Sequence, residues 1–259
     1  MRILFLADVV GTPGRKAIEE RLPSLREELD VDVCVVNGEN VADGVGITPK
    51  LADRLLAAGA DAITLGNHTW RRQEIIPYLV GSDRVIRPAN MGSHAPGKGL
   101  AVVPARDGTP VAVINVIGSL FLQTPVSLWE QIDGLVEEAQ RRAKVIVVDV
   151  HAEATSEKVA LARWLDGKAT LVVGTHTHVQ TNDARVSRGG TAALSDAGMT
   201  GPHDSVIGVQ AELAIRRMRT NMPVRFETAS EDVRIEGVLV ECNENGRAST
   251  CETVRVNIG

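Results

Sequence analysis

The sequence is poor in cysteine and in aromatic residues. Three cysteines occur among 259 residues and none forms a C-x-x-C pair, so the usual cysteine motifs of redox and zinc sites are missing. We expect Cys34 to be a core residue. We expect Cys242 and Cys251 to be reduced and to face each other across a hairpin. Because aromatic residues make up only 3% of the chain, the core must consist mainly of Val, Leu, Ile and Ala.

Long basic and long apolar stretches are also absent. The net charge is −5 and no basic run could form a nucleic-acid groove, which argues against a polymeric nucleic-acid partner. A small anionic substrate is compatible with this charge, since a bound metal can dominate the local field. The N-terminal apolar run stops at Asp8, too early for a signal peptide, and no stretch is long enough to span a bilayer. We therefore expect a cytoplasmic protein that does not associate with membranes.

Apolar strands alternate with amphipathic helices over most of the chain. A chain of 259 residues with 44% apolar content can bury a large core. Strands are expected at residues 3–6, 31–36, 61–65, 84–87, 100–103, 111–117, 145–150 and 169–173, and helices at 14–28, 48–58, 71–80, 127–143 and 156–165. This alternation predicts a largely parallel sheet covered on both faces. No repeat or linker divides the chain, so residues 1–259 are expected to form a single domain.

The C-terminal part changes character. Residues 181–205 are rich in Gly, Thr, Ser and Asp and are typical of a loop, with short strands near Arg185 and Ala192. A helix is expected at residues 209–218. Two strands at residues 234–241 and 252–258 surround a turn-like segment and predict a hairpin. Its apolar segment, residues 238–240, is a candidate edge contact for a homo-oligomer, a dimer or a tetramer.

Polar side chains follow five of the expected strands, at the point where each strand ends. In open α/β sheets this edge is where ligands bind. The residues are Asp8, Glu39, Asn40, Asn67, His68, His151, His176 and His178. Any one of them is weak evidence, because loops are polar, but five strand ends in step are difficult to attribute to chance.

The donor set indicates a metal centre with two ions. Carboxylate, amide and imidazole donors without a thiolate suit Mn, Fe, Zn or Co better than Mg or Ca. Seven of these eight residues, all except His68, are counted as potential ligands, and seven exceed the four of a structural zinc site. In extended backbone, His176 and His178 project to the same side about 7 Å apart at Cα, and can reach two ions separated by roughly 3.5–4 Å. Glu39, central in the set, is the best candidate for a bridging carboxylate.

These residues lie in motifs that resemble those of the calcineurin-like metallophosphoesterases. The motifs are Asp8-Val9-Val10-Gly11, Asn37-Gly38-Glu39-Asn40, Gly66-Asn67-His68-Thr69, Asp149-Val150-His151-Ala152-Glu153 and Gly174-Thr175-His176-Thr177-His178. Three longer strings, over residues 36–40, 151–158 and 196–208, resemble the YmdB-like branch. The resemblance extends from Met1 to about Gly208.

The resemblance implies a four-layer α/β/β/α sandwich, a single metallophosphoesterase domain and a centre with two divalent ions, iron or manganese. One ion would be held by Asp8, Glu39, Asn40 and His178, and the other by Glu39, Asn67, His151 and His176. His68 would be the general acid. The implied reaction is attack of a metal-activated hydroxide on a small phosphodiester, a 2′,3′-cyclic nucleotide, with 3′,5′-cyclic nucleotides as a further class.

The motifs depart from the wider superfamily at two positions. A histidine usually stands where this chain has Val10, and an aspartate where it has Glu39. The first ion would therefore have one imidazole fewer, and Asn40 can fill that place.

Simpler interpretations exist for several of these residues. Asp8 can cap the next helix, Asn40 can order its loop, and His68 can merely position its neighbours. Glu153 and Glu157 can contact the site, although a helix cap and a solvated helix face are the simpler expectations for them. His94 and His203 are expected to be surface residues. The loop at residues 200–205 can either shape the substrate pocket or serve turn geometry.

Two other functions compete with the phosphodiesterase. One is another metallohydrolase, a phosphomonoesterase or nucleotidase. A β-lactamase-like enzyme is disfavoured because Val179-Gln180, not Asp-His, follows the last histidine. The other is a regulatory protein whose metal site is secondary to partner binding.

Overall fold

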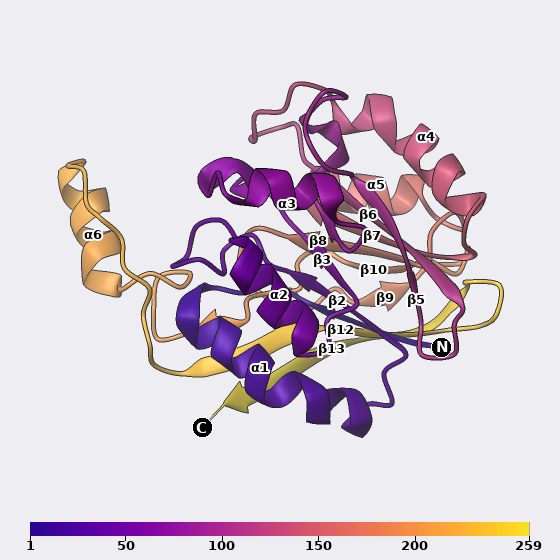
Figure 1. The fold of residues 1–259 in the computed structure, drawn as a ribbon, viewed down its shortest axis with the longest axis horizontal. Coiled ribbons are helices and arrows are strands. Elements are labelled where there is room, and N and C mark those ends of the chain that lie inside the picture. The colour runs from indigo at the N-terminus through magenta and orange to yellow at the C-terminus, as the bar shows by residue number, and fades with distance from the viewer. Residues whose placement is uncertain (259) are drawn as a thin grey trace.

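Two β-sheets pack face to face at the centre of the computed structural model, which describes residues 1–258 (Figure 1). The first sheet has the strand order β11-β12-β1-β2-β3-β4, with β13 paired to β12, and the second has the order β5-β6-β7-β8-β10-β9. The strands are β1 (Arg2–Leu6), β2 (Val33–Asn37), β3 (Ala62–Thr64), β4 (Val85–Ile86), β5 (Leu100–Pro104), β6 (Pro110–Ile117), β7 (Val145–His151), β8 (Leu171–Thr175), β9 (Arg185–Val186), β10 (Ala192–Leu194), β11 (Gly201–Pro202), β12 (Val233–Cys242) and β13 (Ala248–Ile258). The helices are α1 (Gly11–Glu28), α2 (Pro49–Ala57), α3 (Ile75–Gly81), α4 (Leu128–Gln140), α5 (Thr155–Trp164) and α6 (Ala211–Thr220), with short 3₁₀ turns at Thr69–Arg71 and Ala89–Met91.

Three apolar clusters define four layers. The central cluster joins the two sheets through fully buried side chains such as Phe5 and Val147. A second cluster packs α1, α2 and α3 on the outer face of the first sheet, with Leu22 and Leu55 fully buried. The third packs α4 and α5 on the outer face of the second sheet, around Ile132. The architecture is an α/β/β/α sandwich, as the resemblance implied.

The prediction of one largely parallel sheet, made from the strand–helix alternation, is wrong. Each sheet is mixed: β1 pairs parallel with β2 but antiparallel with β12, and β6 pairs parallel with β7 but antiparallel with β5. The alternation determines local structure but not which strands pair. The chain leaves the first sheet after β4, builds the second sheet from the β5–β6 hairpin onward, and returns to the first with β11 and β12.

Local signals account for most helix boundaries. Thr48 caps α2, its Oγ1 accepting a hydrogen bond from the Leu51 N–H at 3.3 Å, and Pro49 occupies the first turn. Pro23 does not end α1, which continues to Glu28 with Leu22 and Leu25 buried on either side of the exposed proline. The helix expected at residues 71–80 begins only at Ile75. Pro77 then falls in its first turn, where a missing N–H has no cost.

The C-terminal hairpin forms as predicted, but two expectations about it are wrong. Strand β12 is not an edge, because it pairs with β1 and with β13, and Val238 and Val240 are fully buried. Residues 238–240 therefore cannot form the edge contact that the sequence suggested for an oligomer. Cys251 pairs with Val240, and Cys242 pairs with Ala248, so the two cysteines do not face each other.

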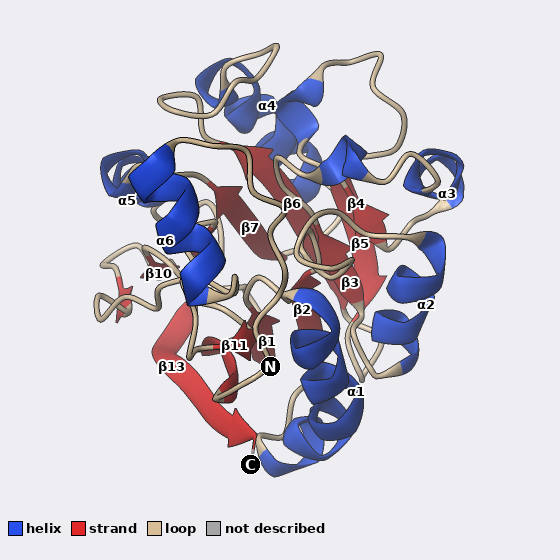
Figure 2. Cartoon of the chain, turned by 90° about the vertical axis from the view of Figure 1, so that its left-hand side faces the viewer, coloured by secondary structure: helices blue, strands red, loops and turns tan. Residues whose placement is uncertain are grey.

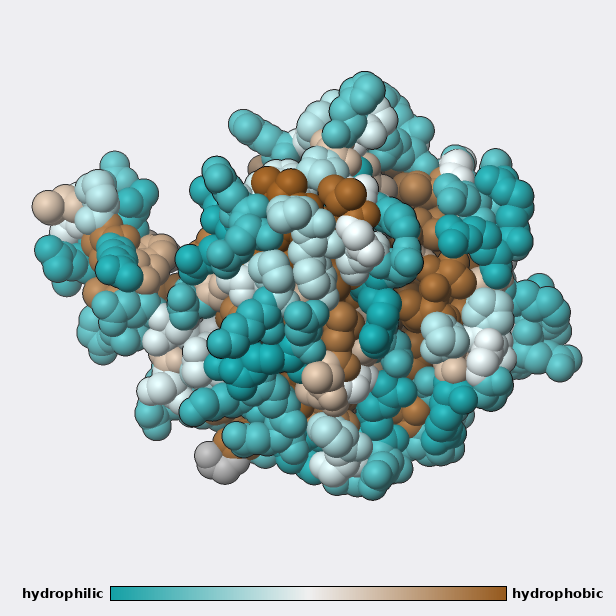
Figure 3. All heavy atoms as spheres, in the orientation of Figure 1, coloured by the Kyte–Doolittle hydropathy of each residue, from teal (hydrophilic) through white to brown (hydrophobic). Residues whose placement is uncertain are grey.

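Helix α6 stands apart from the sandwich (Figures 1 and 2). Only Ala214 of this helix is buried, while Ile215 and Met218 are exposed. Figure 3 shows hydrophobic atoms among the polar ones on this projecting segment. Within residues 1–258, no helix is long and apolar enough to cross a membrane.

Candidate metal centre

The eight predicted site residues converge at one edge of the molecule. They follow the carboxyl ends of β1, β2, β3, β7 and β8. Nε2 of His151 lies 3.1 Å from Oε1 of Glu39, 3.0 Å from Oδ1 of Asn67 and 3.1 Å from Nδ1 of His176. Donor atoms of Glu39, His151 and His176 all lie within 4.8 Å of one another, a group that could hold one ion.

A second group surrounds His178. Its Nε2 lies 3.4 Å from Oδ2 of Asp8 and 3.1 Å from Nδ2 of Asn40. The Nδ2 of Asn40 also lies 3.3 Å from Oε1 of Glu39. The Glu39 carboxylate thus contacts both groups of donors.

Gly66 allows the carboxylate to reach the histidine. A Cβ atom at this position would lie 2.2 Å from Oε2 of Glu39 and 2.4 Å from Nε2 of His151. No side chain fits there. The glycine before Asn67 therefore has a steric role in the site.

The buried donors suit a divalent cation. Oδ1 of Asp8 is buried and has no hydrogen-bond partner among the described residues, an arrangement that a metal ion would satisfy. Burial raises the pKa of Asp8 to about 6, although His178 and His151 oppose this. Burial, and then the neighbouring His151, lowers the pKa of His176 to about 3, which keeps it in the neutral form that binds metals.

Electrostatics at Glu39 favour a positive charge beside it. Burial opposes ionisation of Glu39, but His151 and His68 hold its pKa well below the ordinary value. Burial likewise opposes a charged His151, but Glu39 and then Asp8 raise its pKa to about 9. A dication at this position would take the place of the imidazolium proton.

A chain of hydrogen bonds behind His151 was not predicted from the sequence. Nδ1 of His151 lies 3.0 Å from Oγ1 of Thr175, whose hydroxyl donates to Oδ1 of Asp149 at 2.7 Å. The other oxygen of Asp149 accepts hydrogen bonds from Asn37 and Thr64. This arrangement places the imidazole proton on Nδ1 and leaves Nε2 free to bind a metal. The sequence feature that indicates this chain of hydrogen bonds is Asp149, a carboxylate among the apolar residues of β7 that precede His151.

Asn40 and His68 face each other. Oδ1 of Asn40 lies 2.7 Å from Nδ1 of His68, while its Nδ2 is directed to His178. Ligation of an ion by the Asn40 oxygen therefore requires the amide to be turned over. The interpretation that Asn40 only orders its loop does not account for these two contacts with histidines.

Four of the simpler interpretations can be compared with the structure. Asp8 does not cap α1, because Val10 precedes that helix without a side-chain cap. Glu157 is not on a solvated face: it is buried, and its Oε1 accepts a hydrogen bond from the Ser119 N–H at 2.8 Å.

The two histidines expected at the surface differ from each other. His94 is exposed as expected. His203 is half-buried, with Nε2 3.3 Å from Oε2 of the buried Glu236, and so is not simply a surface residue.

Glu153 is placed beside the site. It precedes α5, which begins at Thr155, but the residue at the cap position is Ala154, without a side-chain cap. Oε2 of Glu153 lies 3.1 Å from Nε2 of His176 instead.

A cavity of about 460 Å³ opens over these donors. Its lining consists of Val10, Glu39, Asn40, Asp43, Gly44, Val45, His68, Glu153, His176, Thr177, His178, Ile207, Gly208, Val209, Phe226, Glu227 and Thr228. The lining contains no Lys or Arg. Substrate charge would therefore have to be met by bound metal rather than by a basic side chain.

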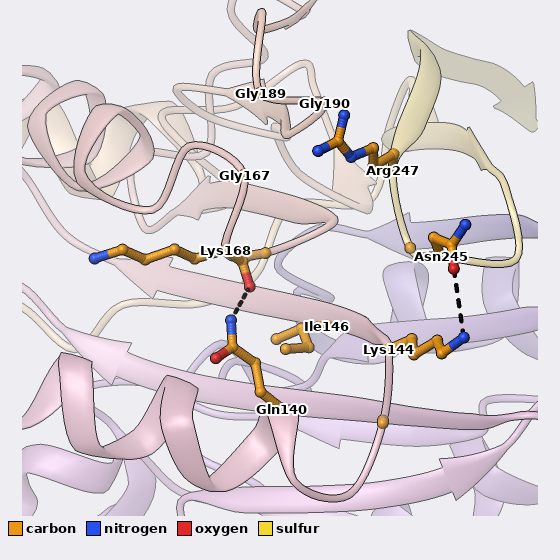
Figure 4. Close-up of a pocket in the computed structure, with 12 residues that line it drawn as sticks. Gln140, Lys144, Ile146, Gly167, Lys168, Gly189, Gly190, Asn245 and Arg247 are labelled. Atoms are coloured by element: carbon orange, nitrogen blue, oxygen red, sulfur yellow. Dashed lines mark hydrogen bonds between the residues drawn. The ribbon is translucent and has the colours of Figure 1, made fainter.

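A second cavity, of about 220 Å³, has the opposite chemistry (Figure 4). Lys144, Lys168 and Arg247 line it, and its lining includes no histidine or carboxylate. It lacks the donors that a divalent cation requires. The candidate metal centre is therefore in the larger cavity.

Comparison with known proteins agrees with this geometry. The model of the family described as YmdB-like protein matches residues 4–254. The chain belongs to the YmdB-like family. It is 44% identical over 258 residues to the 2′,3′-cyclic-nucleotide 2′-phosphodiesterase of Bacillus subtilis (strain 168), covering 99% of this chain and 97% of that one.

Solved structures show the same fold. A structure described as a novel phosphatase from Mycoplasma pneumoniae matches with a TM-score of 0.91 at 31% identity, covering 99% of this chain and 93% of that one. The 5′-nucleotidase precursor of Thermus thermophilus matches with a TM-score of 0.61 at 14% identity, covering 100% of this chain and 54% of that one, which shows the fold alone. The resemblance to the calcineurin-like metallophosphoesterases and the predicted four-layer fold are thus confirmed.

Proposed function

We propose that this chain is a two-metal phosphodiesterase that hydrolyses 2′,3′-cyclic nucleotides. The observation that carries the proposal is the position of Glu39, which contacts the His151 group and, through Asn40, the His178 group. The Bacillus subtilis relative carries this activity in its name. At the level of the enzyme class, a phosphoric diester hydrolase, the prediction from sequence is confirmed by that relative.

The cavity favours a diester over a monoester. Four carboxylates, Asp43, Glu39, Glu153 and Glu227, line it without any Lys or Arg. A phosphate monoester carries a second negative charge near neutral pH that this lining would repel. A diester keeps a single charge, which two dications can neutralise. This argues against the phosphomonoesterase and against a polymeric nucleic acid.

One wall of the cavity is apolar and suits a nucleoside. Val45, Ile207, Val209 and Phe226 line it, and Phe226 is 49% exposed. A nucleobase has a π face that can stack on such a ring. Apolar side chains and candidate metal ligands in one cavity suit a substrate with one charged and one aromatic part.

The residues divide the chemistry between them. Asp8, Glu39, Asn40 and His178 would hold one ion, and Glu39, Asn67, His151 and His176 the other, with iron or manganese as the preferred metals. Bound ions would activate a water molecule and neutralise charge on the phosphate. His68 is half-buried at the cavity, where it can protonate the departing ribose oxygen. Cleavage of the bond to O2′ leaves the phosphate on O3′.

One assay tests the proposed function. Purified protein loaded with Mn²⁺ is incubated with 2′,3′-cyclic adenosine phosphate, and the products are separated by chromatography. We expect the 3′-monophosphate, formed only with metal present. Release of inorganic phosphate from a nucleoside monophosphate at a higher rate would support the nucleotidase instead. A regulatory role would be supported if metal bound without turnover of either substrate.

Three further expectations stay predictions. The central cluster that joins the sheets supports treating the chain as one metallophosphoesterase domain. Assembly into a homo-oligomer and a cytoplasmic location are also expected, and light scattering and cell fractionation would test them.

A further inference from the structure

The two histidines of the motif Gly174-Thr175-His176-Thr177-His178 have an unusual backbone. His176 has φ 101° and His178 has φ 63°, both in the left-handed region. Residues other than glycine adopt such conformations only at a cost in free energy, so the surroundings must hold them there. Because this backbone aims His176 at His151 and His178 at Asp8, whatever holds it also sets the metal geometry.

Thr177, between the two histidines, is bound twice by one oxygen atom. Its N–H donates to Oδ2 of Asp196 at 3.1 Å, and its hydroxyl donates to the same oxygen at 2.8 Å. The other oxygen of Asp196 accepts the N–H of Gly198 at 3.0 Å. Asp196 therefore fixes the middle residue of the turn by both its backbone and its side chain.

A buried lysine completes this arrangement. Nζ of Lys158, on α5, lies 2.7 Å from Oδ2 of Asp196, and the two side chains are only 3% and 2% exposed. The adjoining backbone is packed just as closely: a Cβ atom at Gly174 would lie 1.8 Å from the Ser195 carbonyl oxygen and 2.6 Å from Cδ of Lys158. The strand end and the ion pair leave no space for the turn to shift.

The geometry points to a positioning role for this group: Lys158 and Asp196, acting through Thr177, impose the backbone that directs His176 and His178 to the two metal positions. Neither Lys158 nor Asp196 is part of the ligand set. A buried ion pair is weak evidence for stability, since an apolar pair of similar volume often serves the fold as well. Three donors on one carboxylate oxygen instead indicate a requirement for a fixed geometry.

This inference rests on the proposed metal function, and Mn²⁺ affinity tests it separately from turnover. Affinity is measured by competition with a chelating indicator for the wild-type chain, Thr177→Val and Thr177→Ser. Thr177→Val removes the hydroxyl donor and keeps the shape and the ion pair, whereas Thr177→Ser keeps the donor. We expect Thr177→Val to bind Mn²⁺ about 10- to 100-fold more weakly, as for other groups that orient metal ligands. Thr177→Ser should bind within about threefold of wild type.

A second pair of variants separates positioning from folding. Asp196→Asn should also weaken Mn²⁺ binding. Its matched control is Asp61→Asn. Asp61 likewise accepts a backbone N–H, from Cys34 at 2.7 Å, and pairs with Arg26 at 2.8 Å. Asp61 precedes β3, at the end of the strand opposite to the one that Asn67 follows. The control should keep wild-type affinity. Thermal unfolding of the metal-free proteins, followed by circular dichroism, should show all four variants folded.

Three results would overturn the inference. Wild-type Mn²⁺ affinity in Thr177→Val would show that the contact with Asp196 does not direct the histidines. An equal loss in Asp61→Asn would show a general effect on stability. A wild-type chain that binds no Mn²⁺ would overturn both this inference and the proposed function.

Discussion

Nδ1 of His68 lies 2.7 Å from Oδ1 of Asn40 and 3.3 Å from Oε1 of Glu39. Its backbone N–H donates to the other oxygen of Glu39 at 3.0 Å. These contacts fix one nitrogen of the ring on the metal-ligand side, so the other nitrogen is the one available to a substrate in the cavity. The simpler interpretation, in which His68 only positions its neighbours, uses the same contacts but needs no proton transfer.

A leaving-group comparison separates these two roles of His68. His68→Ala should keep its metals and lose about 100- to 10,000-fold in kcat with an alkyl leaving group, which needs protonation. With p-nitrophenolate, which departs without a proton, the loss should be much smaller. Rates on a cyclic nucleotide and on bis(p-nitrophenyl) phosphate measure this. Equal losses on both substrates would mean that His68 only positions Asn40 or the substrate.

Removal of the Glu39 carboxylate should release both ions together. A shared carboxylate offsets the repulsion between two dications, so neither group of donors is expected to hold its ion well without it. Elemental analysis of purified Glu39→Ala after dialysis measures this, with Glu236→Gln as a control for a buried carboxylate outside the site. One full equivalent of metal retained by Glu39→Ala would argue against a bridge.

The strand ends at which the candidate site residues lie could be predicted well from the sequence. Asp8, Asn67 and His151 each lie at the carboxyl end of an apolar strand, so local pattern was enough to find them. Parallel pairing of β1 with β2 and of β2 with β3, and the packing of this sheet on the one that contains β7, bring them together. The pairing of β12 with β1 could not be predicted from local sequence pattern. It joins residues more than two hundred positions apart, and only tertiary packing selects it.

Residues that support the site were harder to predict than those that form it. Asp196 contacts both Thr177 and Lys158 across the fold, and nothing in the local sequence of Asp196 and Lys158 indicates an ion pair. Glu157 was expected on a solvated face because helix periodicity gives burial only approximately. In the structure it binds the backbone of the loop after β6, a contact set by loop conformation.

The carboxylate of Asp183 should make stability depend on acid pH. Burial opposes its ionisation, but hydrogen bonds from Ser195, Thr181 and Arg185 lower its pKa to about 2 from the ordinary 3.8. A depressed pKa stabilises the fold above the ordinary value, and this contribution is lost as the pH falls from about 4 to about 2. Asp183→Asn should therefore be less stable than wild type at neutral pH, with a difference that narrows below about pH 4. Urea unfolding of both proteins across this range measures the difference. A constant difference would assign the effect to hydrogen-bond geometry and not to charge.

Phe226 should contribute to the binding of the nucleobase and not to the chemistry. It is on the segment that returns from α6 to the sandwich, and it lines the apolar wall of the cavity. Stacking of a base on an aromatic ring is worth about 1–3 kcal/mol, so Phe226→Ala should raise KM for 2′,3′-cyclic adenosine phosphate by about 5- to 150-fold with little change in kcat. With methyl p-nitrophenyl phosphate, which has no base, both constants should be unchanged. Phe121→Ala is the matched control, because Phe121 is 74% exposed and does not line the cavity. A loss of kcat on both substrates would mean that Phe226 shapes the metal site, and an unchanged KM for the nucleotide would place the base elsewhere.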